Sequence, residues 1–304
     1  MPEIITLENP HWRVGLVPAT GGSVAYGQVR IGNEWADVLR PTSAADLSVA
    51  SETASYPLVP WSNRIREGRL LWDGAPYALR TNWPDGTAIH GTGWEYPWEV
   101  VEHTGERAVL RFDSRDFFGV NWPWAFVARF TYALDGDRFE WTYAIDNVDE
   151  EPFPAGFGHH PFLLKRVAGS GEGVLTLHCT RAYALENQMA VAAAGAIPAH
   201  ADFSAGRPIG DTFVDDCLTG RTGEVLATVE YPGALSLDVT ADPLLSHAVL
   251  YVPPGKDFFA LEPVSHANDA FTLQAQGVGG TGLVTLDPGA TVEAGFAIAA
   301  TAQR

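Results

Sequence analysis

The strongest constraint on the fold is an alternation of apolar with polar or small residues that recurs in short runs. In the two clearest runs, residues 125–134 and 138–145, large apolar side chains recur at a spacing of two. This period is typical of a half-buried β-strand. Asp135-Gly136-Asp137 lies between the runs, so the sequence predicts a β-hairpin with a glycine-containing turn.

Runs of the same kind follow later in the chain, at residues 225–231, 234–240, 247–252, 282–287 and 291–299. Convincing helical patterns are scarce. The alanine-rich residues 189–197 are expected to form a helical turn or two before Gly195 and Pro198 stop them. We therefore predict an all-β protein of many short strands, a sandwich or a barrel, with a small-molecule site at a concave face or where loops gather.

No sharp compositional boundary divides the chain, so we expect a single domain over residues 1–304. The formal net charge is −18, from 37 acidic and 19 basic residues, and only Lys165 and Lys256 are lysines. Because binding to a phosphate backbone needs clustered Lys and Arg, nucleic acid and anionic membrane surfaces are poor partners. The charge does not disfavour a neutral small molecule.

Location and assembly are constrained only in part. The two cysteines, Cys179 and Cys217, make no disulfide framework and are expected to be reduced. Residues 1–18 lack a basic segment followed by an apolar run, so no signal peptide is predicted. No stretch approaches the roughly 18 apolar residues of a membrane span. These features predict a cytoplasmic protein and leave its oligomeric state open.

Two patterns bear on cofactors and metals. Residues 277–282 match the G-x-G-x-x-G spacing of dinucleotide-binding proteins, but they run into a predicted strand and not a helix, so nucleotide binding is not expected. His159 and His160 are adjacent, and adjacent strand residues point to opposite faces, so they are not expected to share one metal ion. We predict neither a cofactor nor a metal.

Five segments place polar or ionisable residues among glycine, proline and aromatic residues, as at the mouths of strands. In residues 57–66, Arg64 lies between Trp61 and Ile65. It either satisfies loop carbonyls or presents donors to substrate hydroxyls or a catalytic carboxylate. In the next segment, His90 is either a structural residue or a ligand contact, since the glycines that follow it allow backbone and ligand to approach closely.

His160 and Glu262 carry the candidate acid–base chemistry. Pro161 restrains the backbone of His160 toward extended conformations, so this imidazole is a candidate general acid near neutral pH. His159 is expected to point the other way and to be structural. Glu262 follows four apolar residues, and such surroundings raise a carboxyl pKa and favour a role as base. The alternative for Glu262 is a buried ion pair with Arg64.

Two adjacent acids, Asp215 and Asp216, lie in the fourth segment, residues 213–218. One of them can cap or turn the loop, and the other can accept hydrogen bonds from substrate hydroxyls. The local pattern does not assign the two roles.

Together the segments resemble the aldose 1-epimerase (galactose mutarotase-like) family. The resemblance covers roughly residues 10–300 and rests on five motifs in order, PLVPWSNRI, IHGTGWEYPWEV, GFGHHPF, VDDCL and LEPVSHANDAF. It implies a large antiparallel β-sandwich, called a supersandwich, without cofactor or metal. It also implies an isomerase that interconverts the α and β anomers of a free aldose, with a sugar as its partner.

The resemblance also implies roles for individual residues. His160 matches the family's catalytic acid and Glu262 its catalytic base. Arg64 and His90 match residues that orient the substrate, and Asn63, beside Arg64, joins them as a substrate-binding candidate.

Asp215 is the better match to the substrate-binding aspartate of the family. Leu218 replaces the usual aromatic residue of that motif, so Asp216 stays an alternative. The motif after Glu262 also departs from members that have a Gln directly after the Glu.

Three other functions stay open. An epimerase of hexose 6-phosphates needs extra cations near the 6-position, for which Arg66 and Arg69 are candidates. A glycoside hydrolase would use Asp215 and Glu262 as its carboxylate pair. A non-catalytic sugar-binding protein would bind through polar loops and tryptophans that stack on the sugar.

Overall fold

The computed structural model describes residues 1–303, in which short strands dominate. All strand pairs within the sheets are antiparallel, as the alternating runs predict. The all-β prediction is therefore confirmed. Within the described residues, no helix is long and apolar enough to cross a membrane.

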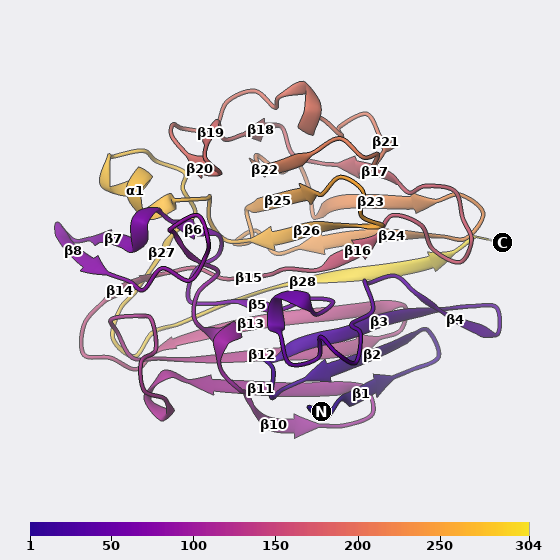
Figure 1. Ribbon diagram of the computed structural model, residues 1–304, viewed down its shortest axis with the longest axis horizontal. Helices are drawn as coiled ribbons and strands as arrows, with labels where there is room; N and C mark the ends of the chain where they lie inside the picture. Colours follow the sequence, from indigo (N-terminus) through magenta and orange to yellow (C-terminus); the bar gives the residue numbers. More distant parts are fainter. Residues whose placement is uncertain (304) are drawn as a thin grey trace.

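The largest sheet has nine strands and extends from β10 at one end of the molecule to β17 and β21 at the other (Figure 1). In sheet order its strands are β10 (Glu99–His103), β11 (Arg107–Asp113), β12 (Phe126–Asp135), β13 (Arg138–Asn147), β28 (Thr291–Ala302), β24 (Leu235–Ala241), β23 (Val225–Tyr231), β17 (Val174–Leu177) and β21 (Arg207–Pro208).

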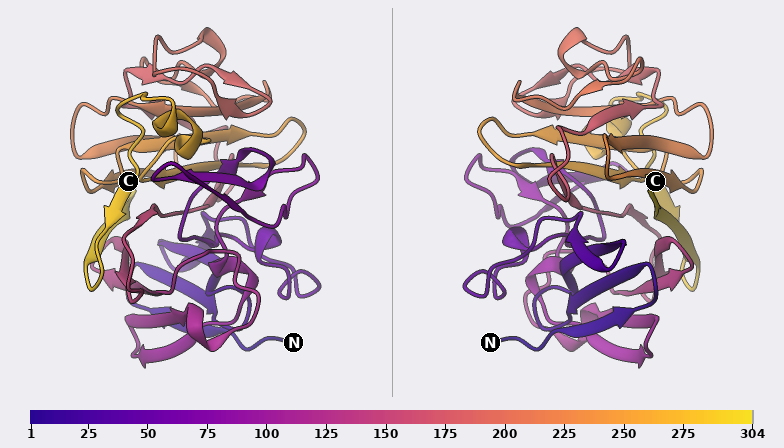
Figure 2. Two further views of the ribbon diagram at one scale, coloured as in Figure 1. Left: turned by 90° about the vertical axis from the view of Figure 1, so that its left-hand side faces the viewer. Right: turned by 90° about the vertical axis from the view of Figure 1, so that its right-hand side faces the viewer.

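Two smaller sheets accompany it. A seven-stranded sheet contains β18 (Arg181–Ala182), β22 (Val214–Thr219), β25 (His247–Val252), β26 (Phe258–Val264), β15 (Gly158–His159) and β5 (Pro57–Leu58), with β16 (Phe162–Leu164) also paired to β26. A four-stranded sheet contains β1 (Ile5–Glu8), β2 (Trp12–Val17), β3 (Ser23–Ile31) and β4 (Glu34–Asp37). In the side views, the indigo strands of the four-stranded sheet lie beside the magenta strands β10–β13. Red and orange strands lie toward the opposite end of the molecule (Figure 2).

Short strand pairs and helical turns complete the fold. The pairs are β6 (Arg64–Ile65) with β9 (Ala88–Ile89), β7 (Arg69–Trp72) with β8 (Ala75–Ala78), β14 (Phe153–Ala155) with β27 (Val284–Leu286), and β19 (Leu185–Glu186) with β20 (Met189–Ala190). The helices are α1 (Ala270–Ala275) and the 3-10 turns η1 (Ala50–Glu52), η2 (Arg66–Gly68), η3 (Gly93–Glu95), η4 (Ser114–Asp116) and η5 (Ala199–Ala201).

The predicted hairpin is present as β12 and β13. Asp135 pairs with Arg138 across the turn, and Gly136 adopts a φ of 57°, which a glycine takes without strain. Along β12 every second side chain, including Phe130 and Tyr132, is fully buried. The period of two therefore directs one face of the hairpin into the core.

The four-stranded sheet packs on this buried face of β12 and β13. The rings of Trp12 and Phe139 lie 5.8 Å apart, and the indole nitrogen of Trp12 donates to the backbone oxygen of Asp137 at 2.7 Å. The Tyr132 hydroxyl donates to the backbone oxygen of Gly22 at 2.9 Å. Buried aromatic rings thus join the two layers while their polar atoms are satisfied.

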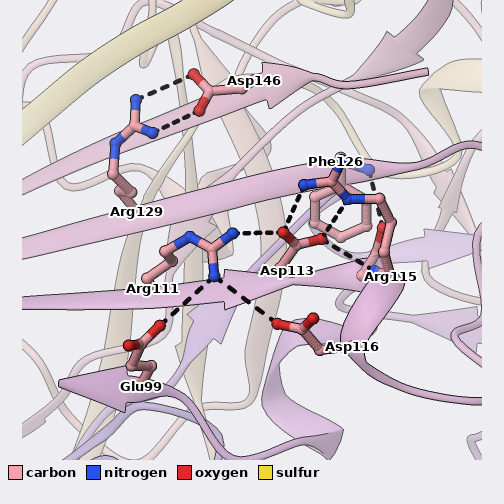
Figure 3. A network of polar contacts seen from close by, with 9 residues as sticks. Glu99, Arg111, Asp113, Arg115, Asp116, Phe126, Arg129 and Asp146 are labelled. Atoms are coloured by element: carbon pink, nitrogen blue, oxygen red, sulfur yellow. Dashed lines mark hydrogen bonds and ion pairs between the residues drawn. The ribbon is translucent and has the colours of Figure 1, made fainter. Parts of the chain in front are cut away.

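A network of arginines and carboxylates covers part of the other face of β11–β13 (Figure 3). The side chain of Asp113 is only 4% exposed and accepts hydrogen bonds from Arg111 and Arg115. Arg129 pairs with Asp146 across β12 and β13, with Nη2 and Oδ1 3.0 Å apart. These contacts give a charged surface to the face of the hairpin that is not in the core.

Two local features differ from the prediction or were not anticipated. Residues 189–197 form no helical turn; they begin with β20, and Gly195 makes a β-bridge with Ala182. Pairing to a neighbouring chain segment thus overrides the helical preference of alanine. The α-helix of the described chain, α1, is short, and its six residues are too few to show a helical period.

Candidate active site

A cleft of about 520 Å³ opens over the seven-stranded sheet, next to β6 and β9. All six residues predicted for the site from the sequence line this one cleft: Asn63, Arg64, His90, His160, Asp215 and Glu262. Its wall also contains Arg40, Tyr56, Trp83, Phe162, Phe213, Tyr251, Lys256 and Phe258. The five motifs, which are far apart in the sequence, therefore meet at one place.

Glu262 reaches the cleft because strand residues alternate between faces. On β26, Phe259 and Leu261 belong to the main hydrophobic core, whereas Phe258 and Glu262 line the cleft. The carboxyl group is only 2% exposed, and its Oε2 has no hydrogen-bond partner among the described residues. Burial raises the pKa of Glu262 well above its ordinary value, and the nearby charge of Asp215 acts in the same direction.

His160 follows β15 and is held between aromatic rings. Its ring stacks on Tyr56 with centroids 4.9 Å apart, and its backbone N–H donates to the backbone oxygen of Tyr56 at 3.1 Å. The ring of Phe162 also packs on the imidazole of His160, with centroids 4.5 Å apart. Burial lowers the pKa of His160 to about 3, and its Nδ1 has no partner among the described residues. His159 points away, into the core, where it contacts Ser55 and the hydroxyl of Tyr132.

His160 and Glu262 contact each other directly, with Nε2 and Oε1 3.1 Å apart. Burial disfavours charge on both groups, so the neutral imidazole beside a protonated carboxyl is the favoured form of this pair. Transfer of that proton across the contact gives imidazolium and carboxylate without changing the net charge of the cleft. A proton at this contact can therefore be carried by either group.

His90 lies next to this pair, with its ring centroid 5.3 Å from that of His160. The backbone N–H of Asn63 donates to its Nδ1 at 3.2 Å, so the proton of the neutral imidazole is on Nε2. Burial, together with His160 and Arg64, lowers the pKa of His90 well below its ordinary value. His90 is therefore a neutral hydrogen-bond donor in the cleft wall.

The glycine after His90 allows two backbone segments to approach closely. Gly91 has a φ of 76°, and a Cβ there would lie 2.0 Å from the backbone oxygen of Val59. A close approach to this glycine was predicted from the sequence. In the structure, the backbone of Val59 is the group that lies close to Gly91. This contact fixes the strand end that carries His90 against the Asn63 segment.

Arg64 does not form the buried ion pair with Glu262 that was an alternative reading of the sequence. Its Nε donates to Oδ2 of Asp85 at 2.9 Å, and its side chain is 11% exposed. The Asn63 side-chain oxygen accepts from the Arg64 backbone N–H at 2.8 Å. Asp85 was not singled out in the sequence, where it lies in an ordinary Pro-Asp-Gly turn.

The structure separates the two aspartates of β22. Asp215 lines the cleft, and burial raises its pKa to about 6, with Asp216 acting in the same direction and Arg64 against it. Asp216 is paired with His200, with Oδ2 and Nε2 2.8 Å apart, and does not line this cleft. The alternation along the strand thus directs Asp215, and not Asp216, into this cleft.

Comparison with known proteins identifies the family of the chain. The family model described as aldose 1-epimerase matches residues 3–299. The chain belongs to the aldose 1-epimerase family. Among curated proteins, this family member is similar to the uncharacterized protein YphB of Escherichia coli K12, at 28% identity over 254 residues, which are 77% of this chain and 81% of that protein.

Two solved structures share the fold of this aldose 1-epimerase family member. A galactose mutarotase-like protein from Clostridium acetobutylicum superposes with a TM-score of 0.86 at 16% identity, covering 99% of this chain and 95% of that one. A GalM/aldose epimerase homologue from C. elegans gives a TM-score of 0.82 at 16% identity and covers both chains completely. The predicted supersandwich is therefore confirmed as the fold.

The sequence motifs of this family member do not include every residue of the cleft. Tyr56, which stacks on His160, directly precedes the first motif and would have been found by extending that motif by one residue. Arg66 and Arg69, the cations suggested for a 6-phosphate, do not line the cleft; Arg66 is instead paired with Asp269 at 3.0 Å. No cluster of three or more His, Cys, Asp or Glu suited to a metal occurs within residues 1–303.

Proposed function

We propose that this protein is an aldose 1-epimerase that interconverts the anomers of a free aldose, with His160 and Glu262 as its acid–base pair. The observation that carries the proposal is their 3.1 Å contact inside the cleft. Mutarotation needs one proton removed from the anomeric hydroxyl and one delivered to the ring oxygen. A pair that shares one proton between two sites suits both transfers.

In the proposed reaction, the carboxylate of Glu262 removes the proton of the hydroxyl on C1, and the imidazolium of His160 protonates the ring oxygen while the C1–O5 bond breaks. The open-chain aldehyde then rotates about C1–C2. The ring closes on the other face as the two groups reverse their roles. The protons return to their starting sites, so the cycle consumes no reagent.

The other residues of the wall are proposed to orient the sugar. His90 donates from Nε2, and Arg64 with Asn63 adds donors on the same side of the cleft. Asp215 accepts hydrogen bonds from hydroxyls distant from C1. Orientation of this kind lowers the barrier by positioning the reacting atoms and adds no chemistry of its own.

Polarimetry tests the proposal and separates it from the alternatives. Freshly dissolved α-D-galactose and α-D-glucose should approach anomeric equilibrium faster with the protein than without it. Release of nitrophenol from nitrophenyl glycosides would instead indicate a hydrolase that uses Asp215 and Glu262. Binding of the sugars without acceleration would indicate a sugar-binding protein and would contradict the proposed enzyme.

We further propose that residues 1–304 act as one domain, because the family match extends from residue 3 to residue 299. A cytoplasmic location is also proposed. It is supported by Cys179 and Cys217, which are both free and buried.

A further inference from the structure

Two cationic side chains, Arg40 and Lys256, line the cleft, and the proposed reaction uses neither. No ion pair among residues 1–303 includes either of them. Other cations of the described chain without an ion pair, such as Arg30 and Arg69, do not line this cleft. The two cations therefore need a separate explanation.

Arg40 is held in place by its surroundings and is only partly exposed. Its Nη2 donates to the backbone oxygens of Thr53 at 2.6 Å and Ser51 at 3.4 Å. The guanidinium carbon lies 4.0 Å from the ring centroid of Phe162 and 4.6 Å from that of Phe258. No further hydrogen bond of this guanidinium to the described residues is found, so its Nε and Nη1 keep donors for a ligand.

Lys256 precedes β26 and is exposed. The other lysine of the chain, Lys165, is buried and bonds Asp211 at 3.3 Å. Lys256 thus differs from Lys165 in two ways: it has no carboxylate partner, and it lines the cleft. Lys256 is two residues before Phe258, whose ring Arg40 contacts, and all three residues line the cleft.

Nearby carboxylates do not neutralise these cations by direct contact. Glu52 lines the same cleft, and Asp257 follows Lys256, and both act on the charge of Arg40 from a distance. Both are exposed, so water screens them. An anion that binds Arg40 and Lys256 inside the cleft would make shorter contacts than either carboxylate does.

Arg40 is close to the proposed reaction centre. The ring of Phe162 contacts His160 on one side, at 4.5 Å between centroids, and Arg40 on another, at 4.0 Å. The ring of Phe162 therefore separates His160 from Arg40.

We propose that the cleft selects an aldose that carries an anionic group at the end remote from C1, with Arg40 and Lys256 as the residues that determine this specificity. The proposal rests on the proposed function and narrows its substrate class. A carboxylate of a uronic acid and a phosphate ester of a hexose share the chemistry that Arg and Lys recognise. The experiment distinguishes these two sources.

The test compares kcat/KM for anomerisation of D-galactose, D-galacturonate and D-galactose 6-phosphate at low ionic strength. The wild type should prefer at least one of the anionic sugars to galactose by about tenfold, the effect of one charge-assisted contact. Lys256→Gln and Arg40→Gln should lose most of this preference and leave kcat/KM for galactose within about twofold. Added salt should reduce the preference in the wild type.

Arg69→Gln is the matched control, because it removes one exposed positive charge that does not line the cleft. It should leave the preference unchanged. Lys256→Gln changes an exposed side chain and should fold normally, so it decides the question even where Arg40→Gln disturbs packing. The proposal is overturned if the wild-type kcat/KM for galactose equals that for both anionic sugars. It is also overturned if the cleft variants change kcat/KM equally for all three sugars.

Failure of the proposed function gives a different result. If the wild type accelerates none of the three sugars, calorimetry of sugar binding tests the cation site by itself. Tighter binding of an anionic sugar than of galactose, lost in Lys256→Gln but kept in Arg69→Gln, would support the site. Equal binding of all three sugars, or no binding, would overturn it.

Discussion

The Nε2 atom of His160 lies 3.1 Å from Oε1 of Glu262, and both side chains are almost completely buried. The two residues come from different strands of the seven-stranded sheet region, one after β15 and one within β26. Burial favours the neutral form of each, which leaves one proton between them. We regard this shared proton as the basis of the proposed mutarotase activity.

The first prediction concerns pH. Burial raises the pKa of Asp215 to about 6, so its carboxylate form, which accepts hydrogen bonds from hydroxyls, is lost as the pH falls through this value. We expect kcat/KM for the preferred aldose to decrease below about pH 6. Asp215→Asn should have a lower kcat/KM, and its pH profile should lack this limb, the decrease below about pH 6.

Asp216→Asn is the control for the pH prediction, because Asp216 bonds His200 and does not line the cleft. It should keep the limb but move it to a lower pH, because the charge of Asp216 helps to raise the pKa of Asp215. A limb that persists in Asp215→Asn would assign it to another group and contradict the role of Asp215.

The second prediction concerns Gly91. A Cβ at this position would lie 2.0 Å from the backbone oxygen of Val59, in addition to the cost of its φ of 76°. We expect Gly91→Ala to lower the free energy of unfolding by more than about 3 kcal/mol, measured by urea denaturation. Gly74 has a φ of 75°, and a Cβ there would have no atom within 4 Å. Gly74→Ala should therefore lower the free energy of unfolding by only about 1–2 kcal/mol. Equal losses would show that the contact with Val59 is unimportant.

The alternation of residues in the sequence predicted much of the fold. It anticipated the hairpin of β12 and β13 and the later strands, because each depends on local spacing and turn chemistry. It failed at residues 189–197, where pairing of Gly195 with Ala182 overrides alanine's helical preference. Composition carries no information about that partner.

The candidate site was predictable as a set of residues but not as an arrangement. The motifs identified six of the residues that line the cleft. The contact between His160 and Glu262, the pairing of Arg64 with Asp85 and the presence of Arg40 all depend on how distant strands meet. Nothing in the local sequence of any one of these residues names its partner.

The third prediction concerns the surface network of Figure 3. Hydrogen bonds from Arg115, with the charge of Arg111, hold the pKa of Asp113 down at about 2. A carboxyl whose folded pKa is depressed adds stability above its unfolded pKa, near 3.8, and loses it as the pH falls toward 2. We expect Asp113→Asn to reduce the free energy of unfolding by about 1 kcal/mol at pH 7, since solvent screens part of the interaction.

The difference between wild type and Asp113→Asn should shrink below about pH 4 and vanish near pH 2, measured by denaturant unfolding at each pH. Asp116→Asn is the matched control. Its carboxylate is 63% exposed and 3.7 Å from Arg111, so its effect should be smaller at every pH. A loss for Asp113→Asn that does not change with pH would mean that packing, and not charge, is responsible.

The most direct test of the central claim is the rate of anomerisation in Glu262→Gln and His160→Asn, followed by polarimetry with a freshly dissolved α-aldose that the wild type accelerates. Both substitutions keep the approximate size of the side chain and remove its part in proton transfer. Each should lower kcat by about 10²–10⁴-fold while calorimetry still detects sugar binding, and the double variant should lose little more than either single one. Retention of near wild-type kcat in either variant would contradict a mechanism in which His160 and Glu262 share the catalytic proton.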